Sequence, residues 1–225
     1  MAEVRIVLSA AFTQAYQELV PQFEQETGHR ITTIPRTTSE IQAQMESGET
    51  ADLLLLPSAQ LEVLRKLGFV TRHIDVCTCG VAAAVKAGAP KPDISSSDAL
   101  KQSVLAAKSI VYSKGPSGIY LAGLFERMGI AETIKGKLKV VTGEPTGAVA
   151  ARGEAELAFQ QMSELLPVAG IDIVGPLPAE VQKVTVFGAG VHASAKEPAA
   201  GMAFAEFFRR PEFVPLLKRK GLEPA

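Results

Sequence analysis

The chain has 225 residues, 47% of them hydrophobic, and its 23 Lys and Arg residues nearly balance its 24 Asp and Glu residues. No apolar run approaches the roughly 20 residues of a membrane span, and neither sign of charge forms a block. The lack of a long apolar run argues against membrane insertion, and the lack of a broad electrostatic field argues against nucleic acid or an acidic membrane surface as a partner. We expect a globular protein with a small ligand.

The N-terminal part of the chain alternates between strand and helix patterns. Val4–Leu8 is a short apolar run that predicts a strand. Apolar side chains then recur at helical spacing from Phe12 to Phe23, and the predicted helix ends at Gly28. Arg30–Ile34 is the next predicted strand.

A second helix and a buried strand follow. Ser39 and, three residues later, Gln42 form a capping-box pattern that opens a helix running to Gly48. Asp52–Leu56 is apolar on both faces, which is typical of a central parallel strand covered by helices on each side. The repeated alternation predicts the α/β class.

Two long extended runs bracket a block of further strand and helix patterns. The extended runs are Cys77–Val85 and Val181–His192. Inside the block, strands are predicted at Ser109–Tyr112, Lys139–Val141 and Leu157–Phe159, and helices from Gly118 to Met128 and from Thr146. Two C-terminal helices are predicted at about Pro198–Arg209 and Pro211–Lys220. This order suits a discontinuous two-domain plan, but periodicity alone does not distinguish it from a single doubly wound sheet.

The only cysteines, Cys77 and Cys79, lie on the same face of a predicted strand. That is poor geometry for a disulfide, and no His or further Cys lies nearby to complete a metal site. We therefore expect two buried free thiols, no metal and no cofactor.

The start of the chain leaves its location open. It begins almost directly in a strand, without the basic and apolar regions of a leader peptide. The alternatives are a periplasmic protein whose leader has been removed and a cytoplasmic protein.

Five segments, in order, resemble the molybdate-binding component of bacterial ABC importers. They are LSAAFTQAYQELVPQFEQETG, TTSEIQAQMESGETADLLLL, GPSGIYLAGLFERMGI, ARGEAELAFQQMSE and FFRRPEFVPLLKRKGL. The resemblance covers most of the chain and implies a two-lobed type II periplasmic-binding fold, each lobe a mainly parallel sheet flanked by helices. Lobe 1 would comprise residues 1–80 and 190–225, and lobe 2 residues 81–189, with hinge strands near 77–85 and 181–192.

The resemblance also implies a monomer that closes around a small anion and delivers it to an ABC transporter permease. Helix starts suit an anion because they present unpaired N–H donors and a partial positive charge. Four candidate starts follow strands, at Ser9–Phe12, Arg36–Ser39, Ser117–Ile119 and Gly143–Thr146. Each also has a purely structural interpretation as a strand end, a cap or a turn.

The predicted ligand-binding residues are Ser9, Ala10, Ala11, Arg36, Thr37, Thr38, Ser39, Ser117, Gly118, Ile119, Gly143 and Gln161. Ala11 and Gln161 stand where the resemblance places a serine and a tyrosine, and the loss of these hydroxyls weakens a site for a tetrahedral oxyanion. Arg36 adds a planar donor fork that matches a carboxylate. These departures favour a small organic carboxylate over molybdate.

Two functions remain, a solute-binding protein and an isomerase. In these departures the chain resembles the aconitate isomerases of the same superfamily, whose allylic proton shift needs a base near the C–H bond. Glu144, at a candidate helix start, is the candidate base. His29, His73 and His192 are alternatives that lie away from the four starts. A protein-interaction role, the third class, would need a large exposed apolar patch.

Overall fold

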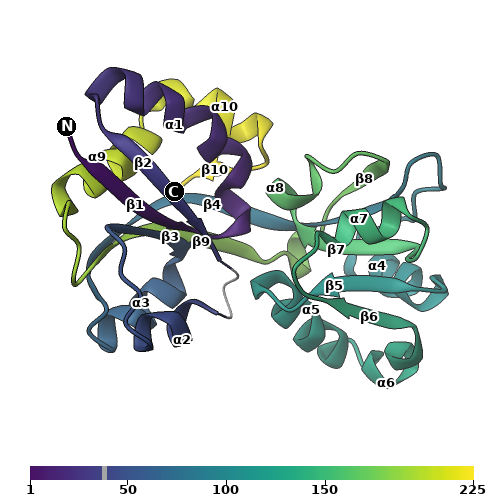
Figure 1. Ribbon diagram of the computed structural model, residues 1–225. Coiled ribbons are helices and arrows are strands. Elements are labelled where there is room, and N and C mark those ends of the chain that lie inside the picture. The colour runs from purple at the N-terminus through teal and green to yellow at the C-terminus, as the bar shows by residue number, and fades with distance from the viewer. Residues whose placement is uncertain (37–39) are drawn as a thin grey trace. The chain divides into compact units, whose positions relative to one another are not determined.

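A computed structural model describes residues 1–36 and 40–225, which form two compact units (Figure 1). Unit 1 comprises Met1–Cys79 and Thr185–Ala225, and unit 2 comprises Gly80–Val184. Each unit contains a sheet with helices on both faces, which confirms the predicted α/β class. The chain passes between the units twice, first within a long strand at Cys79 and Gly80, and again at Val184 and Thr185.

The sheet of unit 1 has a parallel part and an antiparallel part. β1 (Glu3–Leu8) lies between β2 (Arg30–Pro35) and β3 (Leu53–Pro57) and is parallel to both. β9 (Val184–His192) runs antiparallel to β3. Next to β9 comes β4 (Val70–Lys86), with which the short β10 (Glu223–Pro224) pairs. The carboxyl ends of the three parallel strands therefore lie at one edge of the sheet.

Helices cover both faces of this sheet (Figure 1). One face carries the 3-10 turn η1 (Ala10–Phe12), α1 (Thr13–Thr27), α9 (Pro198–Phe208), the 3-10 turn η4 (Pro211–Phe213) and α10 (Val214–Arg219). The other carries α2 (Ile41–Glu46) and α3 (Ser58–Lys66), which pack on β1 and β3. Because helices cover both sides, Leu53, Leu54, Leu55 and Leu56 are all 0% exposed, as the sequence predicted for this strand.

An aromatic cluster joins α1 to α9. The rings of Phe12 and Phe208 meet edge to face at 5.6 Å, and those of Phe23 and Phe204 at 5.1 Å. Such pairs add about 0.5–1.5 kcal/mol beyond burial. Helix α1 is capped at its C-terminus by Gly28, whose φ of 71° is a conformation that favours glycine.

The sheet of unit 2 is built around three parallel strands. β5 (Ile110–Ser113) lies between β6 (Leu138–Val141) and β7 (Leu157–Gln161). The second half of β4 runs antiparallel to β7 and to β8 (Ile171–Pro176). The carboxyl ends of β5, β6 and β7 again lie at one edge.

The two faces of this sheet carry different helices. One face packs on α4 (Ser97–Ala106), α5 (Pro116–Arg127) and α6 (Ala131–Ile134), which the 3-10 turn η2 (Lys135–Lys137) extends. The other packs on α7 (Thr146–Ala151) and α8 (Met162–Leu165). No helix within the described ranges combines the length and apolarity that crossing a bilayer requires.

Two predicted elements are shorter than expected. The predicted extended run over residues 181–192 contains the end of a 3-10 turn, η3 (Ala179–Val181), and its strand begins only at Val184. Before Val184, the Gln182 side chain bonds the N–H and the carbonyl of Val81 at 3.0 and 3.1 Å, beside a backbone bond from the Val81 N–H to the carbonyl of Lys183 at 3.3 Å. The helix predicted from Ser39 is α2, and Ser39 itself lies outside the described residues.

The two cysteines are buried free thiols, as predicted. The Sγ of Cys79 donates to the carbonyl of Gly221 at 3.2 Å. Burial raises the pKa of the Cys77 thiol above its usual range, which disfavours the nucleophilic thiolate form.

Helix α5 approaches strand β5 closely at Gly118. A Cβ atom on Gly118 would lie 1.6 Å from the carbonyl oxygen of Ser113 and 2.9 Å from the Tyr112 ring. The oxygen belongs to the backbone at the end of β5 and cannot rotate away. Gly118 is therefore a packing requirement, independently of any ligand.

Gly118→Ala should destabilise the fold by about 1–3 kcal/mol or more, because overpacking forces the backbone apart. Gly123→Ala on the same helix is the matched control, since its Cβ would meet only the end of the flexible Arg127 side chain at 3.3 Å. That control should be neutral or stabilising by up to about 1 kcal/mol. Thermal unfolding followed by circular dichroism measures both, and equal midpoints for the two variants would contradict the close approach.

Candidate functional site

Ser9 and Arg36 lie together at the carboxyl edge of the unit 1 sheet. The N–H of Ser9 donates to the carbonyl of Leu55 at 3.1 Å, and the N–H of Arg36 donates to the carbonyl of Leu8 at 3.2 Å. The first bond extends the hydrogen bonding of β1 with β3 by one residue, and the second extends that of β2 with β1. The first two predicted helix starts are therefore brought together by backbone pairing.

Each of these residues holds a buried polar atom that has no partner among the described residues. The atoms are Oγ of Ser9, whose residue is only 3% exposed, and Nε of Arg36. An unsatisfied buried polar group costs about 1–3 kcal/mol. Two of them at one edge indicate a place where a ligand or water accepts hydrogen bonds.

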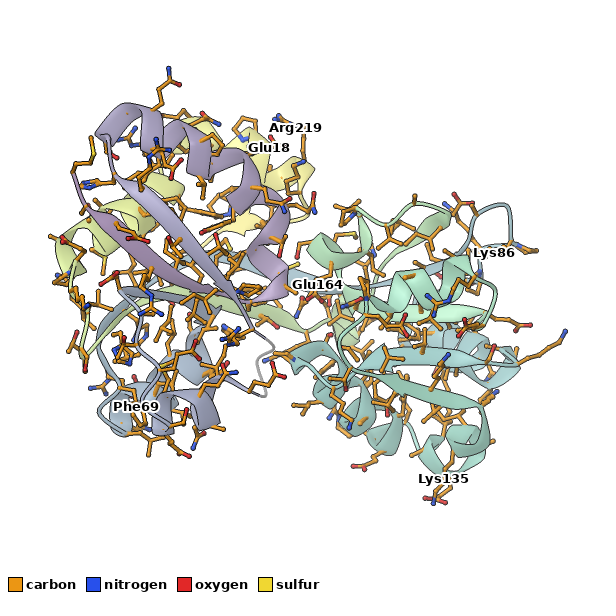
Figure 2. All side chains as sticks on the ribbon, viewed as in Figure 1. Glu18, Phe69, Lys86, Lys135, Glu164 and Arg219 are labelled. Carbon is orange, nitrogen blue, oxygen red and sulfur yellow. The ribbon has the colours of Figure 1, made fainter. Side chains whose placement is uncertain are left out.

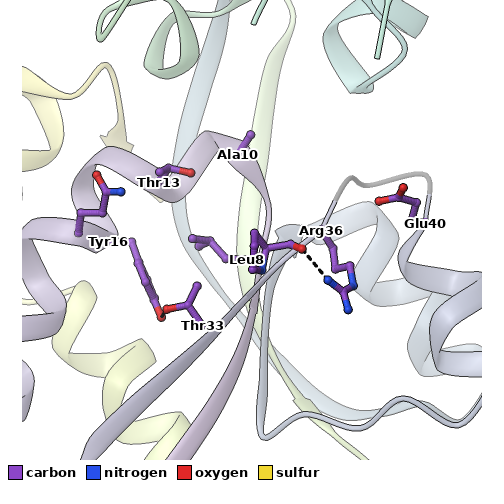
Figure 3. Close-up of a pocket in the computed structure, with 9 residues that line it drawn as sticks. Leu8, Ala10, Thr13, Tyr16, Thr33, Arg36 and Glu40 are labelled. Atoms are coloured by element: carbon purple, nitrogen blue, oxygen red, sulfur yellow. Dashed lines mark hydrogen bonds between the residues drawn. The ribbon is translucent and has the colours of Figure 1, made fainter. Parts of the chain in front are cut away.

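The rest of the Arg36 guanidinium is held by the protein. Nη1 donates to the carbonyl of Pro35 at 2.9 Å (Figure 3), and Nη2 forms an ion pair with Glu49 at 2.9 Å. The Arg36 and Glu49 side chains are 30% and 19% exposed. Arg36 is thus oriented by Glu49, and Nε–H is a buried donor of its guanidinium fork that has no partner among the described residues.

An open pocket of about 560 Å³ adjoins Arg36 (Figure 3). Its lining consists of Leu8, Ala10, Thr13, Tyr16, Gln17, Thr33, Pro35, Arg36 and Glu40. The hydroxyls of Tyr16 and Thr33 lie 2.7 Å apart, and burial raises the pKa of Tyr16 to about 12, so its hydroxyl stays protonated.

Ala10 and Arg36 were predicted as ligand-binding residues and line this pocket, whereas the hydroxyl-bearing Tyr16 and Thr33 were not predicted. Tyr16 fits the apolar helical spacing of α1, and Thr33 lies inside a strand, so neither stood out. Ala11, beside the pocket residue Ala10, is 5% exposed. The predicted residues Thr37, Thr38 and Ser39 lie outside the described residues.

In unit 2, the start of α5 supplies backbone donors. Pro116 has no N–H, and the N–H of Ile119 donates to the carbonyl of Gly115 at 3.0 Å. Ser117 and Gly118 therefore carry the first-turn N–H groups available to a ligand, and Gly115 provides no side-chain cap. Ile119 is 71% exposed and offers only its apolar side chain.

A buried polar network occupies the same edge of unit 2. Oε1 of Gln160 accepts hydrogen bonds from N and Oγ1 of Thr146 at 2.8 and 2.9 Å. The Glu164 carboxyl accepts hydrogen bonds from the Gln160 side chain and from the N–H of Gln161. Burial raises the pKa of Glu164 to about 7, and these hydrogen bonds limit the rise. Gln161, a predicted site residue, is 2% exposed.

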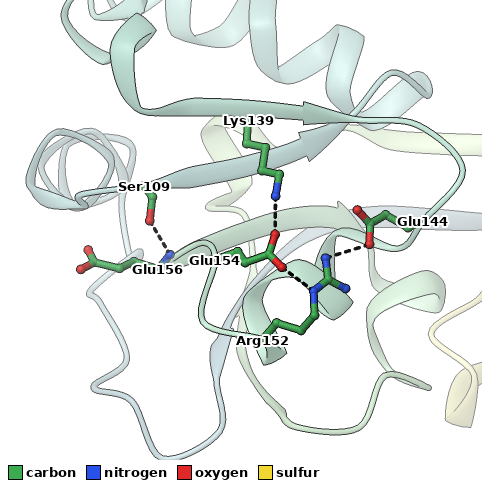
Figure 4. A network of polar contacts seen from close by, with 6 residues as sticks. All are labelled: Ser109, Lys139, Glu144, Arg152, Glu154 and Glu156. Atoms are coloured by element: carbon green, nitrogen blue, oxygen red, sulfur yellow. Dashed lines mark hydrogen bonds and ion pairs between the residues drawn. The ribbon is translucent and has the colours of Figure 1, made fainter.

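The predicted base Glu144 belongs to an ion-pair network (Figure 4). Its carboxylate lies 3.0 Å from Arg152, which also pairs with Glu154, and Glu154 in turn pairs with Lys139. The Glu144 carboxylate is thus neutralised by an ion pair, although its side chain is 39% exposed. The neighbouring Gly143 has a φ of 82° and forms the turn before α7.

Two of the three histidines lie at the amino ends of the parallel strands. Nδ1 of His29 accepts a hydrogen bond from the N–H of Ala2, just before β1. The N–H of His192 donates to the carbonyl of Asp52, just before β3. Both positions are at the opposite edge from Ser9 and Arg36, and His73 lies in β4. Within residues 1–36 and 40–225, no group of His, Cys, Asp or Glu side chains is arranged to hold a metal ion.

The sequence matches known proteins over almost its full length. Residues 4–223 match the family of bacterial extracellular solute-binding proteins. An aconitate isomerase from a Pseudomonas species is 35% identical over 97% of this chain and 87% of that protein. The molybdate-binding protein of Escherichia coli K12 is 24% identical over 97% of this chain and 88% of that protein.

Solved structures show the same fold. The periplasmic molybdate-binding protein of Azotobacter vinelandii superposes with a TM-score of 0.80 at 18% identity, over 99% of each chain. The periplasmic-binding fold that the sequence predicted is confirmed. Since the family match spans both units, the chain belongs to the bacterial extracellular solute-binding protein family.

Proposed function

We propose that this protein binds a small organic carboxylate of the aconitate class in preference to a tetrahedral oxyanion. The carrying observation is the pair of buried donors without partners among the described residues, Ser9 Oγ and Arg36 Nε, at one edge of unit 1. A guanidinium N–H is a strong donor to a carboxylate.

The pocket beside these donors supports a ligand with a carbon skeleton. Leu8, Ala10 and Pro35 provide apolar lining, while the hydroxyls of Tyr16 and Thr33 are polar groups at a separate position. A compact symmetric oxyanion needs donors converging on one point. An elongated molecule with several polar groups fits the mixed lining better.

A second candidate function is isomerisation of an unsaturated polycarboxylate. It is favoured by the relative at 35% identity, which is an aconitate isomerase, whereas the molybdate-binding relative is 24% identical. In unit 2, the N–H groups of Ser117 and Gly118 are suited to bind a carboxylate.

We also propose that the protein works outside the cytoplasm, in keeping with its family. In a binding role, it would deliver the ligand to an ABC transporter permease.

A thermal-shift panel of cis-aconitate, trans-aconitate, citrate, molybdate, tungstate and sulfate tests the ligand class. We expect the aconitates to raise the unfolding midpoint, because a ligand at about 100 times its Kd stabilises the folded state by about 2.7 kcal/mol. Molybdate and sulfate should have little effect. A shift with molybdate alone would contradict the proposal.

Arg36→Ala and Ser9→Ala should both weaken carboxylate binding measured by calorimetry. Loss of a hydrogen bond to a charged ligand costs about 1.5–3 kcal/mol, or roughly 10- to 150-fold in Kd. The unliganded Ser9→Ala protein should be as stable as wild type or more stable, because the variant removes a hydroxyl that has no partner among the described residues. The control is Arg65→Ala, whose guanidinium pairs with Glu62 at the surface of unit 1. Unchanged affinity in both site variants would remove Ser9 and Arg36 from the site.

We further propose that residues 77–85 and 181–192 act as hinge strands between lobe 1 (1–80 and 190–225) and lobe 2 (81–189). The support is that the chain passes between the compact units only twice. Ligand contacts that favour a closed form would shift the population toward it. Small-angle scattering should then give a smaller radius of gyration with a calorimetrically confirmed ligand, and an unchanged radius would count against the hinge.

A further inference from the structure

We propose that Glu164 is the catalytic acid–base of this protein, removing a proton from a carbon beside a carboxylate of the bound ligand and returning it to another carbon. The inference rests on the proposed carboxylate ligand, and it deepens the isomerase candidate by naming the group that moves the proton. Its basis is the position of the carboxyl and the way in which the surrounding residues hold it.

Glu164 lies where a ligand of unit 2 is expected. It belongs to α8, which follows β7 directly, at the edge where β5, β6 and β7 end (Figure 2). Ligands of open α/β sheets bind beyond the carboxyl ends of the strands. Glu164 as a whole residue is neither fully buried nor fully exposed, although its carboxyl is strongly desolvated.

The carboxyl is held in one orientation by a directional chain of hydrogen bonds. Oε1 of Gln160 accepts from both donors of Thr146, so the amide group of Gln160 is turned with its NH₂ toward Glu164. The N–H of Gln161 donates to the same carboxyl. Thr146 is 0% exposed and Gln160 is 6% exposed, so the orienting groups are rigidly placed. A pre-oriented carboxyl suits proton transfer.

Glu164 also lacks the cationic partner that the neighbouring acids have. In unit 2, Glu144 pairs with Arg152, Glu154 with Arg152 and Lys139, and Glu156 with Lys108. Across the part of the chain that the structure describes, no Lys, Arg or His forms an ion pair with Glu164. Without a counter-charge, burial raises the pKa of this carboxyl to about 7. Such a group can accept and release a proton near neutral pH.

The proposed step is a balanced 1,3-proton shift on an aconitate-type ligand. The ionised Glu164 takes a proton from the CH₂ group that lies between a carboxylate and the double bond. The electron pair left behind delocalises over the allyl system and the adjacent carboxylate. Glu164 then delivers the proton to the far carbon of the former double bond, and a new double bond forms toward the original CH₂ carbon. No oxidant or net proton is needed, and N–H donors at the start of α5 would stabilise the developing negative charge.

The test compares wild type with Glu164→Gln, which keeps the side-chain length and an acceptor oxygen. Isomerisation of trans-aconitate to cis-aconitate is followed by chromatography, deuterium uptake from D₂O at the ligand carbons by NMR, and binding by calorimetry. We expect Glu164→Gln to lose about 10²–10⁴-fold in kcat and in deuterium uptake, with Kd within a few fold of wild type. Glu132→Gln, at an exposed ion pair with Lys135, is the control that keeps wild-type rates.

Each other outcome has a definite meaning. Full turnover in Glu164→Gln, or loss of turnover only in Glu144→Gln, overturns the role of Glu164. Wild-type protein that binds the aconitates without turnover or deuterium uptake also overturns it, while the carboxylate-binding proposal stands. If the wild-type protein binds no carboxylate, both the carboxylate-binding proposal and the role of Glu164 are wrong. If Glu164→Gln does not fold, Glu164→Asp replaces it, since moving the carboxyl by one methylene should lower turnover and deuterium uptake while binding persists.

Discussion

The parallel pairing of β1 with β2 and β3 is the constraint from which the unit 1 site follows. The register sets Leu8 opposite both Pro35 and Leu55, so the next residues along two of the strands, Ser9 and Arg36, must emerge at one edge. Backbone hydrogen bonds hold both residues there. Oγ of Ser9 and Nε of Arg36 are buried there and have no partner among the described residues. The candidate site in unit 1 is thus a consequence of sheet geometry more than of loop conformation.

Much of the fold was predictable because the central strands are buried on both faces and carry a strong apolar pattern. β1, β3, β5 and α1 follow such runs, and their predicted bounds agree with the structure to within about two residues, the ordinary uncertainty of element ends. The first half of β4 was missed because Val70–Asp75 mixes polar and apolar residues. The amphipathic helices α3 and α4 were also missed.

The candidate site was predictable only where it depends on strand ends. Ser9 and Arg36 follow apolar runs, so chain order alone placed them at one edge. Glu164 carried no such signal, because its environment comes from Thr146, which is distant in sequence and bonds Gln160. Glu144 lies at a predicted helix start. Its ion pair with Arg152 could not be predicted, because it depends on how α7 folds between the two residues. Burial and pairing of a carboxyl are properties of tertiary structure, so a sequence pattern cannot rank two glutamates as bases.

A carboxyl without a counter-charge has opposite effects on binding and on catalysis. Two like charges about 4 Å apart repel by about 4 kcal/mol at the effective dielectric constant of a protein surface. In a protein that only binds a dianion such as molybdate, an ionised Glu164 near the ligand would weaken affinity, and selection for tight binding would favour a neutral residue. A proton-shifting enzyme requires this group, because the base must lose its proton before it can take one from carbon. In the proposed role, a pKa of about 7 would let Glu164 be neutral while an anionic ligand enters and ionised when it acts as a base. The same backbone donors can serve both functions, so the difference between a binding protein and an isomerase on this fold can reside in one side chain.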